Sequence, residues 1–261
     1  VFLEGGLSRD GRLRPAKLGF LDYMLRSYDP AKDRDIVFIP VGVNYDRTLE
    51  DRSLLRELDP DVEKRSSWFV VKTTCGFIWK SLILIILSRW QRFGYAYVNF
   101  GNPVSVRHYC KENSLDFKKL ERSARFLEVE NLADRLMEAI EQVVPALPVS
   151  LVATVMLESD PKGMRAFEVQ TQVNRLIADL QDDGAHVYVS PRQPVESILN
   201  ALNMLVLRRL VQESQGIYSI IPAELGVLSY YANAIAHWRH DFPGANGPLH
   251  QKSNAGANNG A

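Results

Sequence analysis

A short stretch near the start of the sequence combines residue types that suit a phosphate group. Gly5 and Gly6 allow backbone conformations closed to other residues and leave room for a ligand beside the chain. Ser8 adds a hydroxyl, and Arg9 adds a forked, permanently charged donor that matches phosphate oxygens. Glu4 can orient an arginine or accept a hydrogen bond from a substrate hydroxyl. Further positive charge follows at Arg12, Arg14 and Lys17. The stretch predicts an anion-binding loop, although it is neither a Walker loop nor a dinucleotide fingerprint.

Hydrophobic periodicity predicts the elements that position this loop. The apolar residues 1–3 are typical of the end of a buried strand, and residues 18–28 have helical spacing up to an Asp-Pro pair. Residues 36–43 and 95–101 have the β-branched and aromatic composition of buried strands. A strand, a loop, a helix and another strand predict a βαβ-type unit, and therefore an α/β fold class. Because a domain rarely begins on a core strand, we expect the chain to be a fragment of a longer protein.

The sequence becomes mostly helical after residue 117. Helices are expected at residues 132–144, 149–157, 161–180, 194–203 and 223–240, and strands at residues 187–189 and 217–222. A turn at residues 214–216 makes the last strand part of a β-hairpin. We therefore predict an α/β part at residues 1–110 and a helical C-terminal domain, similar to a winged helix, at residues 111–242. Residues 243–261 are rich in Gly, Asn and Ala and are expected to form a disordered tail.

Charge and cysteine content limit the function classes. Lys and Arg total 31, as do Asp and Glu, so the formal net charge is zero. Nucleic-acid-binding proteins are usually basic, and no nucleic-acid partner is expected, including for the winged-helix-like segment. Cys75 and Cys110 have no partner motif, so we expect two ordinary core thiols in a reducing compartment and no metal site.

One apolar run raises the question of membrane contact. Residues 77–87 are mostly apolar but are interrupted by Lys80 and Ser81, and a membrane-spanning helix needs about 20 apolar residues. Two interpretations stay open. The run is either a buried helix or a segment in the membrane interface, with nearby tryptophans and cations at the level of the lipid headgroups.

Four stretches, in order along the chain, resemble blocks of the glycerolipid acyltransferases, and most closely the membrane-bound bacterial glycerol-3-phosphate acyltransferases. They are Phe-Leu-Glu-Gly-Gly-Leu-Ser-Arg-Asp-Gly-Arg at residues 2–12, residues 36–45, residues 94–103, and Tyr-Tyr-Ala-Asn-Ala-Ile-Ala-His at residues 230–237. The resemblance implies the C-terminal part of an acyltransferase α/β domain followed by a mostly helical domain. It also implies transfer of a fatty acyl group from acyl-CoA or acyl-carrier protein to the 1-hydroxyl of glycerol 3-phosphate, the first step of phospholipid synthesis.

The resemblance assigns roles to individual residues. It implies that the glycerol phosphate is bound by Glu4, Gly5, Gly6, Ser8, Arg9 and Arg12. It implies that the acyl-donor side is shaped by Ile39, Pro40 and Val41. It further implies no cofactor beyond the acyl donor, and a peripheral position on the cytoplasmic face of the inner membrane. Leu7 departs from the family, in which this position is commonly Arg. Either Arg12 or Arg14 could replace the lost contact, and dihydroxyacetone phosphate stays open as an acceptor.

The chemistry also needs a general base to take the hydroxyl proton. In the family this base is the His of a His-x-x-x-x-Asp block, and none of the five histidines here has Asp five positions later. We therefore expect the block upstream of Val1, and we expect this chain alone to be inactive. The alternative is a non-catalytic anion- or membrane-binding module that uses the same loop without transferring an acyl group.

Overall fold

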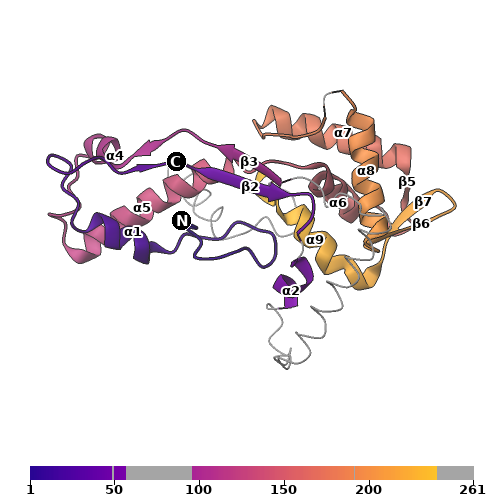
Figure 1. The fold of residues 1–261 in the computed structure, drawn as a ribbon, viewed down its shortest axis with the longest axis horizontal. Coiled ribbons are helices and arrows are strands. Elements are labelled where there is room, and N and C mark those ends of the chain that lie inside the picture. Colours follow the sequence, from indigo (N-terminus) through magenta and orange to yellow (C-terminus); the bar gives the residue numbers. More distant parts are fainter. Residues whose placement is uncertain (49, 57–95, 191, 240–261) are drawn as a thin grey trace, which may run out of the picture.

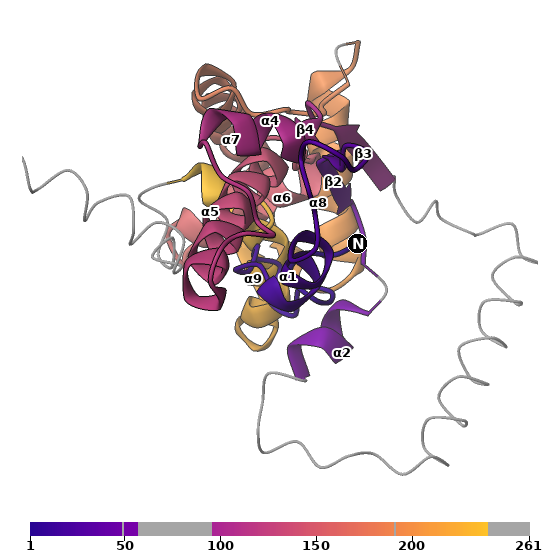
Figure 2. The same ribbon diagram turned by 90° about the vertical axis from the view of Figure 1, so that its left-hand side faces the viewer.

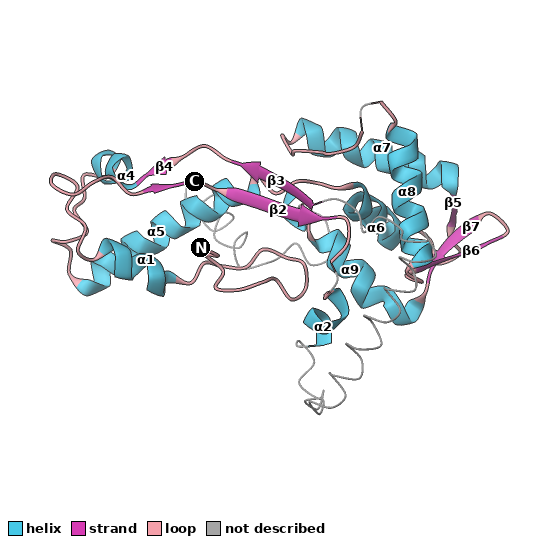
Figure 3. Cartoon of the chain, viewed as in Figure 1, coloured by secondary structure: helices cyan, strands magenta, loops and turns pink. Residues whose placement is uncertain are grey.

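The computed structural model describes residues 1–48, 50–56, 96–190 and 192–239 (Figure 1). The apolar run at residues 77–87, Cys75 and the expected tail at residues 243–261 lie outside the described residues. Helices dominate, and the strands are short (Figure 3). The mixed α/β class is therefore confirmed, but the predicted arrangement of the sheet is not.

The elements of the N-terminal part surround one long helix. Along the chain they are α1 (Leu18–Leu25), β1 (Val37–Phe38), β2 (Val41–Tyr45), α2 (Asp51–Arg56), β3 (Ala96–Phe100), β4 (Val104–Ser105), α4 (Val106–Glu112) and α5 (Arg122–Glu141). Strand β1 pairs with β4 and β2 pairs with β3, both antiparallel. The predicted βαβ unit is therefore wrong among the described residues. Helix α1 packs against α5 rather than bridging two parallel strands (Figure 2).

The prediction of a buried strand at residues 1–3 is also wrong. Val1 is 93% exposed and Phe2 is 69% exposed. The backbone here forms turn contacts instead of a ladder, because the amide of Gly5 donates to the carbonyl of Phe2 at 3.0 Å. The amide of Lys17 donates to the carbonyl of Leu3 at 2.8 Å, which closes the segment into a loop.

The strands expected at residues 36–43 and 95–101 exist but are not fully buried. The first is divided into β1 and β2 at Pro40, which has no amide hydrogen to donate. One face of the β2–β3 ribbon packs on the chain after α5, where Asn44 Nδ2 donates to the Pro145 carbonyl at 2.8 Å. The opposite face is apolar and exposed at Val41, Val43, Tyr45, Val98 and Phe100. The apolar composition predicted strands buried on both faces, but the two strands form a ribbon that is covered on one face alone.

The C-terminal part contains a three-stranded antiparallel sheet and the helices that pack on it. Its elements are α6 (Pro148–Glu158), β5 (Met164–Arg165), α7 (Ala166–Asp182), α8 (Pro194–Leu207), β6 (Val211–Ser214), β7 (Ile217–Ile220), the 3₁₀ turn η1 (Pro222–Glu224), α9 (Leu225–Asn233) and the 3₁₀ turn η2 (Ala236–Trp238). The strand order is β5-β7-β6. The predicted hairpin is confirmed, with Gln215 and Gly216 both at positive φ in its turn. The expected strand at residues 187–189 is only a bridge between Ala146 and Val187.

Two apolar clusters hold the described chain together. One joins α1, α4 and α5 through residues such as Leu21, Phe117 and Leu132, which are all fully buried. The other surrounds α6, whose residues from Pro148 to Met156 are all buried. The division at residues 110 and 111 stays a prediction, and the first cluster extends across it to Leu136.

Candidate functional site

The loop at residues 4–12 is held together by its own polar groups. The Ser8 hydroxyl lies 2.7 Å from the carbonyl oxygen of Arg12 and 3.2 Å from Asp10 Oδ1. The amide of Arg12 donates to the same Asp10 oxygen at 3.1 Å. Ser8 therefore points into the loop, where it fixes the chain on both sides of Arg9. The sequence predicted a hydroxyl directed at the ligand, whereas here the hydroxyl orders the loop.

Glu4 is also engaged within the loop. Its Oε2 accepts a hydrogen bond from the amide of Arg14 at 2.9 Å, which ties the two ends of the loop together. Burial raises the pKa of the Glu4 carboxyl above its usual value, although the hydrogen bond and the charge of Arg14 oppose this shift. Nearby Asp10 acts in the same direction as burial. Glu4 thus stabilises the loop conformation, and its contact with a substrate stays a prediction.

The glycines and Arg9 form the outer side of the loop. Gly5 has a φ of +76°, a conformation that favours glycine. Gly5, Gly6 and Leu7 are exposed, as is Arg9, while Arg12 is half-buried. An exposed guanidinium can donate two parallel hydrogen bonds to an anion that arrives from solvent.

Helix α9 contacts the loop directly at Asp10 and Gly11. The side chain of Asn233 donates from Nδ2 to the carbonyl oxygen of Asp10 at 2.8 Å. Gly11 has a φ of +86°, and a Cβ atom at that position would lie 2.0 Å from the carbonyl oxygen of Tyr230. The glycine therefore allows the loop and the helix backbone to make direct contact. Sequence reasoning found both segments but did not predict that they meet.

The three residues expected on the acyl-donor side lie where β1 gives way to β2. Ile39 is 57% exposed and Val41 is 39% exposed, whereas Pro40 is buried. The carbonyl of Pro40 accepts a hydrogen bond from the amide of Gly101 at 2.8 Å, which fixes the break between the strands. This places an exposed apolar pair on a separate element from the loop.

A buried polar network lies on another side of α9, and no motif in the sequence indicated it. The guanidinium of Arg208 contacts the carboxylate of Asp51 and the hydroxyl of Tyr231. The Tyr231 hydroxyl donates to Asp51 Oδ2 at 2.6 Å and accepts from the amide of Thr48 at 3.1 Å. Burial is the main cause that raises the Tyr231 pKa. The network joins α2 to the end of α8 and to α9, and no local pattern could have predicted partners so far apart.

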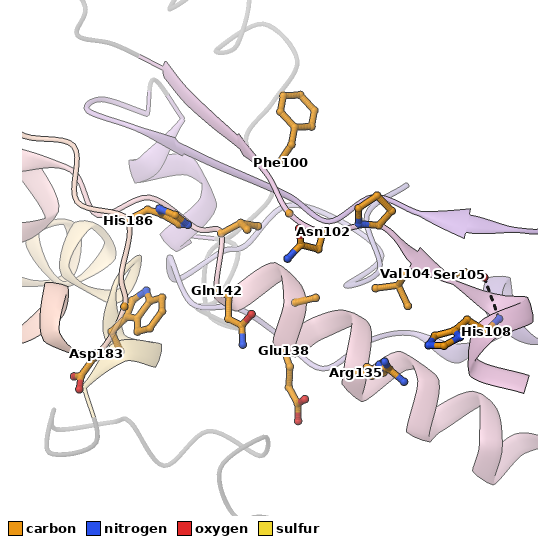
Figure 4. A pocket seen from close by; sticks show the side chains of 16 residues that line it. Phe100, Asn102, Val104, Ser105, His108, Arg135, Glu138, Gln142, Asp183 and His186 are labelled. Carbon is orange, nitrogen blue, oxygen red and sulfur yellow. Dashed lines mark hydrogen bonds between the residues drawn. The ribbon is translucent and has the colours of Figure 1, made fainter. Parts of the chain in front are cut away.

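A groove with a volume of about 720 Å³ lies apart from the loop, between the β3–β4 connection and α5 (Figure 4). His108 and Arg135 lie at one end, and Asp183 and His186 lie at the other (Figure 4).

Glu112 accepts from Arg135 at 2.8 Å and lies 3.0 Å from His108 Nε2. The hydrogen bond from Arg135 is the first cause that lowers the Glu112 pKa. His108 is therefore in contact with a partly exposed carboxylate. Within the described part of the chain, no three His, Cys, Asp or Glu side chains gather as metal ligands do.

Comparison with known proteins gives consistent matches. Residues 81–239 match the family described as "Glycerol-3-phosphate acyltransferase C-terminal region". Three similar proteins are each named "Glycerol-3-phosphate acyltransferase". The protein from Pseudoalteromonas translucida is 27% identical over 90% of this chain and 29% of its own length. The protein from Xanthomonas campestris is 28% identical over 90% of this chain and 26% of its own length. The protein from Pseudomonas fluorescens is 33% identical over 60% of this chain and 18% of its own length.

This chain thus spans less than a third of the length of the relatives that it matches. Among the helices in the described ranges, none combines the length and the apolar character that crossing a membrane requires.

Proposed function

Because this chain belongs to the family of glycerol-3-phosphate acyltransferase C-terminal regions, we propose that it carries the acceptor-phosphate site of such an enzyme. The enzyme would move a fatty acyl group from acyl-CoA or acyl-carrier protein to the 1-hydroxyl of glycerol 3-phosphate. The site would consist of the loop from Glu4 to Arg12, with Arg9 on the phosphate.

One observation carries the proposal: the loop is ordered by internal hydrogen bonds while its cationic side stays exposed. Ser8, Asp10 and Arg12 fix the loop, and Arg9 is exposed, as are Gly5 and Gly6. An ordered loop loses less conformational entropy when it binds a small anion. A guanidinium also matches phosphate oxygens with two parallel donors.

The remaining parts of the reaction are assigned by the same proposal. Ile39 and Val41, both exposed and apolar, would face the acyl donor, with Pro40 fixing the break between them. The chain would act at the membrane surface, where the acyl product belongs. The general base would come from outside this chain. None of the five histidines has the family spacing, His108 is paired with Glu112, and His237 contacts the carbonyl of Glu141.

Calorimetric titration with sn-glycerol 3-phosphate tests the site, with glycerol as the uncharged comparison. We expect glycerol 3-phosphate to bind and glycerol not to bind. Arg9→Ala should weaken binding about 10- to 100-fold, because a hydrogen bond to a charged group contributes about 1.5–3 kcal/mol. The matched control is Arg175→Ala, which removes an exposed arginine from α7 and should leave affinity unchanged. Equal affinity for Arg9→Ala and the control would refute the assignment.

A second measurement tests whether the general base lies outside this chain. Incubating the chain with glycerol 3-phosphate and palmitoyl-CoA should release no free CoA above the rate of the uncatalysed reaction. Turnover by the chain alone would contradict the proposal that the base lies elsewhere. A parallel titration with dihydroxyacetone phosphate would show whether Leu7 broadens the choice of acceptor.

A further inference from the structure

The loop and helix α9 meet at three adjacent points. Asn233 Nδ2 donates to the carbonyl oxygen of Asp10, Gly11 lies against the carbonyl of Tyr230, and a Cβ atom on Gly11 would also lie 3.3 Å from Asn233 Cβ. Asn233 is only 8% exposed, so its amide is removed from water. A buried donor that lost its acceptor would be costly, which makes this contact specific rather than incidental.

Asp10 connects the Asn233 side chain to the rest of the loop through its own hydrogen bonds. Its backbone carbonyl is held by Asn233, and its carboxylate accepts from the amide of Arg12 and lies within reach of the Ser8 hydroxyl. Ser8 in turn contacts the carbonyl of Arg12. Fixing Asp10 therefore fixes the residues on both sides of Arg9.

We propose that Asn233 is a positioning residue for the acceptor-phosphate site, which holds the Glu4–Arg12 loop in its binding conformation without touching the ligand. The inference rests on the proposed function of the loop. It assigns a role to the C-terminal helix, 223 positions away in the sequence from the carbonyl it holds. Without the contact the loop must be ordered by the ligand itself, which reduces affinity.

The sharpest test is Asn233→Asp, which keeps the size of the side chain but replaces the amide donor with a carboxylate that faces the Asp10 carbonyl oxygen. Tyr231→Phe is the matched control, because it lies on the same helix and removes a buried hydroxyl that contacts Thr48 and Asp51 instead of the loop. A merely structural loosening of α9 would affect both variants alike. Asn233→Gln serves as the conservative variant, since it keeps an amide donor on a longer side chain.

Two readouts are measured on the unmodified chain and each variant. Hydrogen exchange of the amides at residues 5–12 reports how firmly the loop is held, and titration with sn-glycerol 3-phosphate reports binding. We expect Asn233→Asp to accelerate loop exchange and weaken binding, each by at least about three- to tenfold, because one neutral hydrogen bond is lost and a carboxylate then faces a carbonyl oxygen. Asn233→Gln should recover part of both losses. Tyr231→Phe should accelerate exchange near Thr48 and leave the loop and its affinity unchanged.

The two hypotheses fail in different ways. If the unmodified chain binds glycerol 3-phosphate and Asn233→Asp binds it equally well, the positioning role is wrong and the proposed function stands. Equal losses in Asn233→Asp and Tyr231→Phe would also overturn the positioning role, because the effect would then belong to the whole helix. If the unmodified chain does not bind glycerol 3-phosphate at all, the proposed function fails, and the positioning role fails with it.

Discussion

Replacing Gly11 with alanine should release the loop from helix α9. The residue has a φ of +86°, and the left-handed conformation costs a non-glycine residue about 1–2 kcal/mol. The added Cβ atom would lie 2.0 Å from the carbonyl oxygen of Tyr230 and 3.0 Å from its carbon. These are backbone atoms of a helix, so the loop has to move away, and it then loses the bond from Asn233, worth about 1 kcal/mol. We expect a total cost of about 2–3 kcal/mol.

The assay must separate loss of the loop from loss of the fold. Both apolar clusters consist mainly of residues outside the loop, so the cost should appear first as local opening. Hydrogen exchange at residues 5–12 should therefore accelerate about 30- to 150-fold, while the urea midpoint shifts less. Gly6→Ala is the matched control, because a Cβ atom there meets no atom within 4 Å. If the two variants exchange within about twofold of each other, the loop does not rest on α9 as described.

Three further changes test other parts of the structure. Asp51→Ala leaves a buried guanidinium without its carboxylate and should lower the free energy of unfolding by about 3–5 kcal/mol in urea titrations. Burial, with two nearby carboxylates, raises the pKa of Cys110 to about 11, so in a Cys75→Ser background the remaining thiol should react with a disulfide reagent at pH 8 only after denaturation. Since its ordinary pKa is 9.0, the unfolded thiol ionises first, and stability should fall as the pH rises from 9 towards 11. Gly42→Ala places a Cβ atom 2.2 Å from a backbone carbonyl oxygen and should lower stability by about 1–3 kcal/mol in thermal unfolding, whereas the open position of Gly226→Ala should not show this loss.

Local patterns predicted the elements whose causes are local. The hairpin follows from a glycine-containing turn just before the short run Ile-Tyr-Ser-Ile, which forms its second strand as expected. Helix α6 follows from a long apolar run that begins at Pro148, a residue suited to the first turn of a helix. A loop with Gly5 and Gly6 was also predictable from its glycines, whereas its role in binding phosphate stays a prediction.

Contacts between distant residues were the part that local patterns could not predict. The strand expected at residues 1–3 needs a ladder partner, and the described backbone forms turns there instead. The ribbon of β2 and β3 has the composition of a doubly buried strand pair, yet only the face towards Pro145 is covered. Asp51 and Arg208 are 157 positions apart, and periodicity carries no information about which buried charge meets which.

Helix α9 brings together two stretches at opposite ends of the chain that both resemble the same family. Successive residues of an α-helix are rotated by about 100°, so the side chains of Asn233 and Tyr231 point to different sides. The Asn233 side chain contacts Asp10 of the loop, and the Tyr231 hydroxyl contacts Thr48 and Asp51. Gly11 lies against the backbone carbonyl of Tyr230. One short helix therefore fixes the loop and the segment after β2 at the same time. A substitution on either side should disturb its own segment first, which is why Asn233 and Tyr231 can be tested against each other.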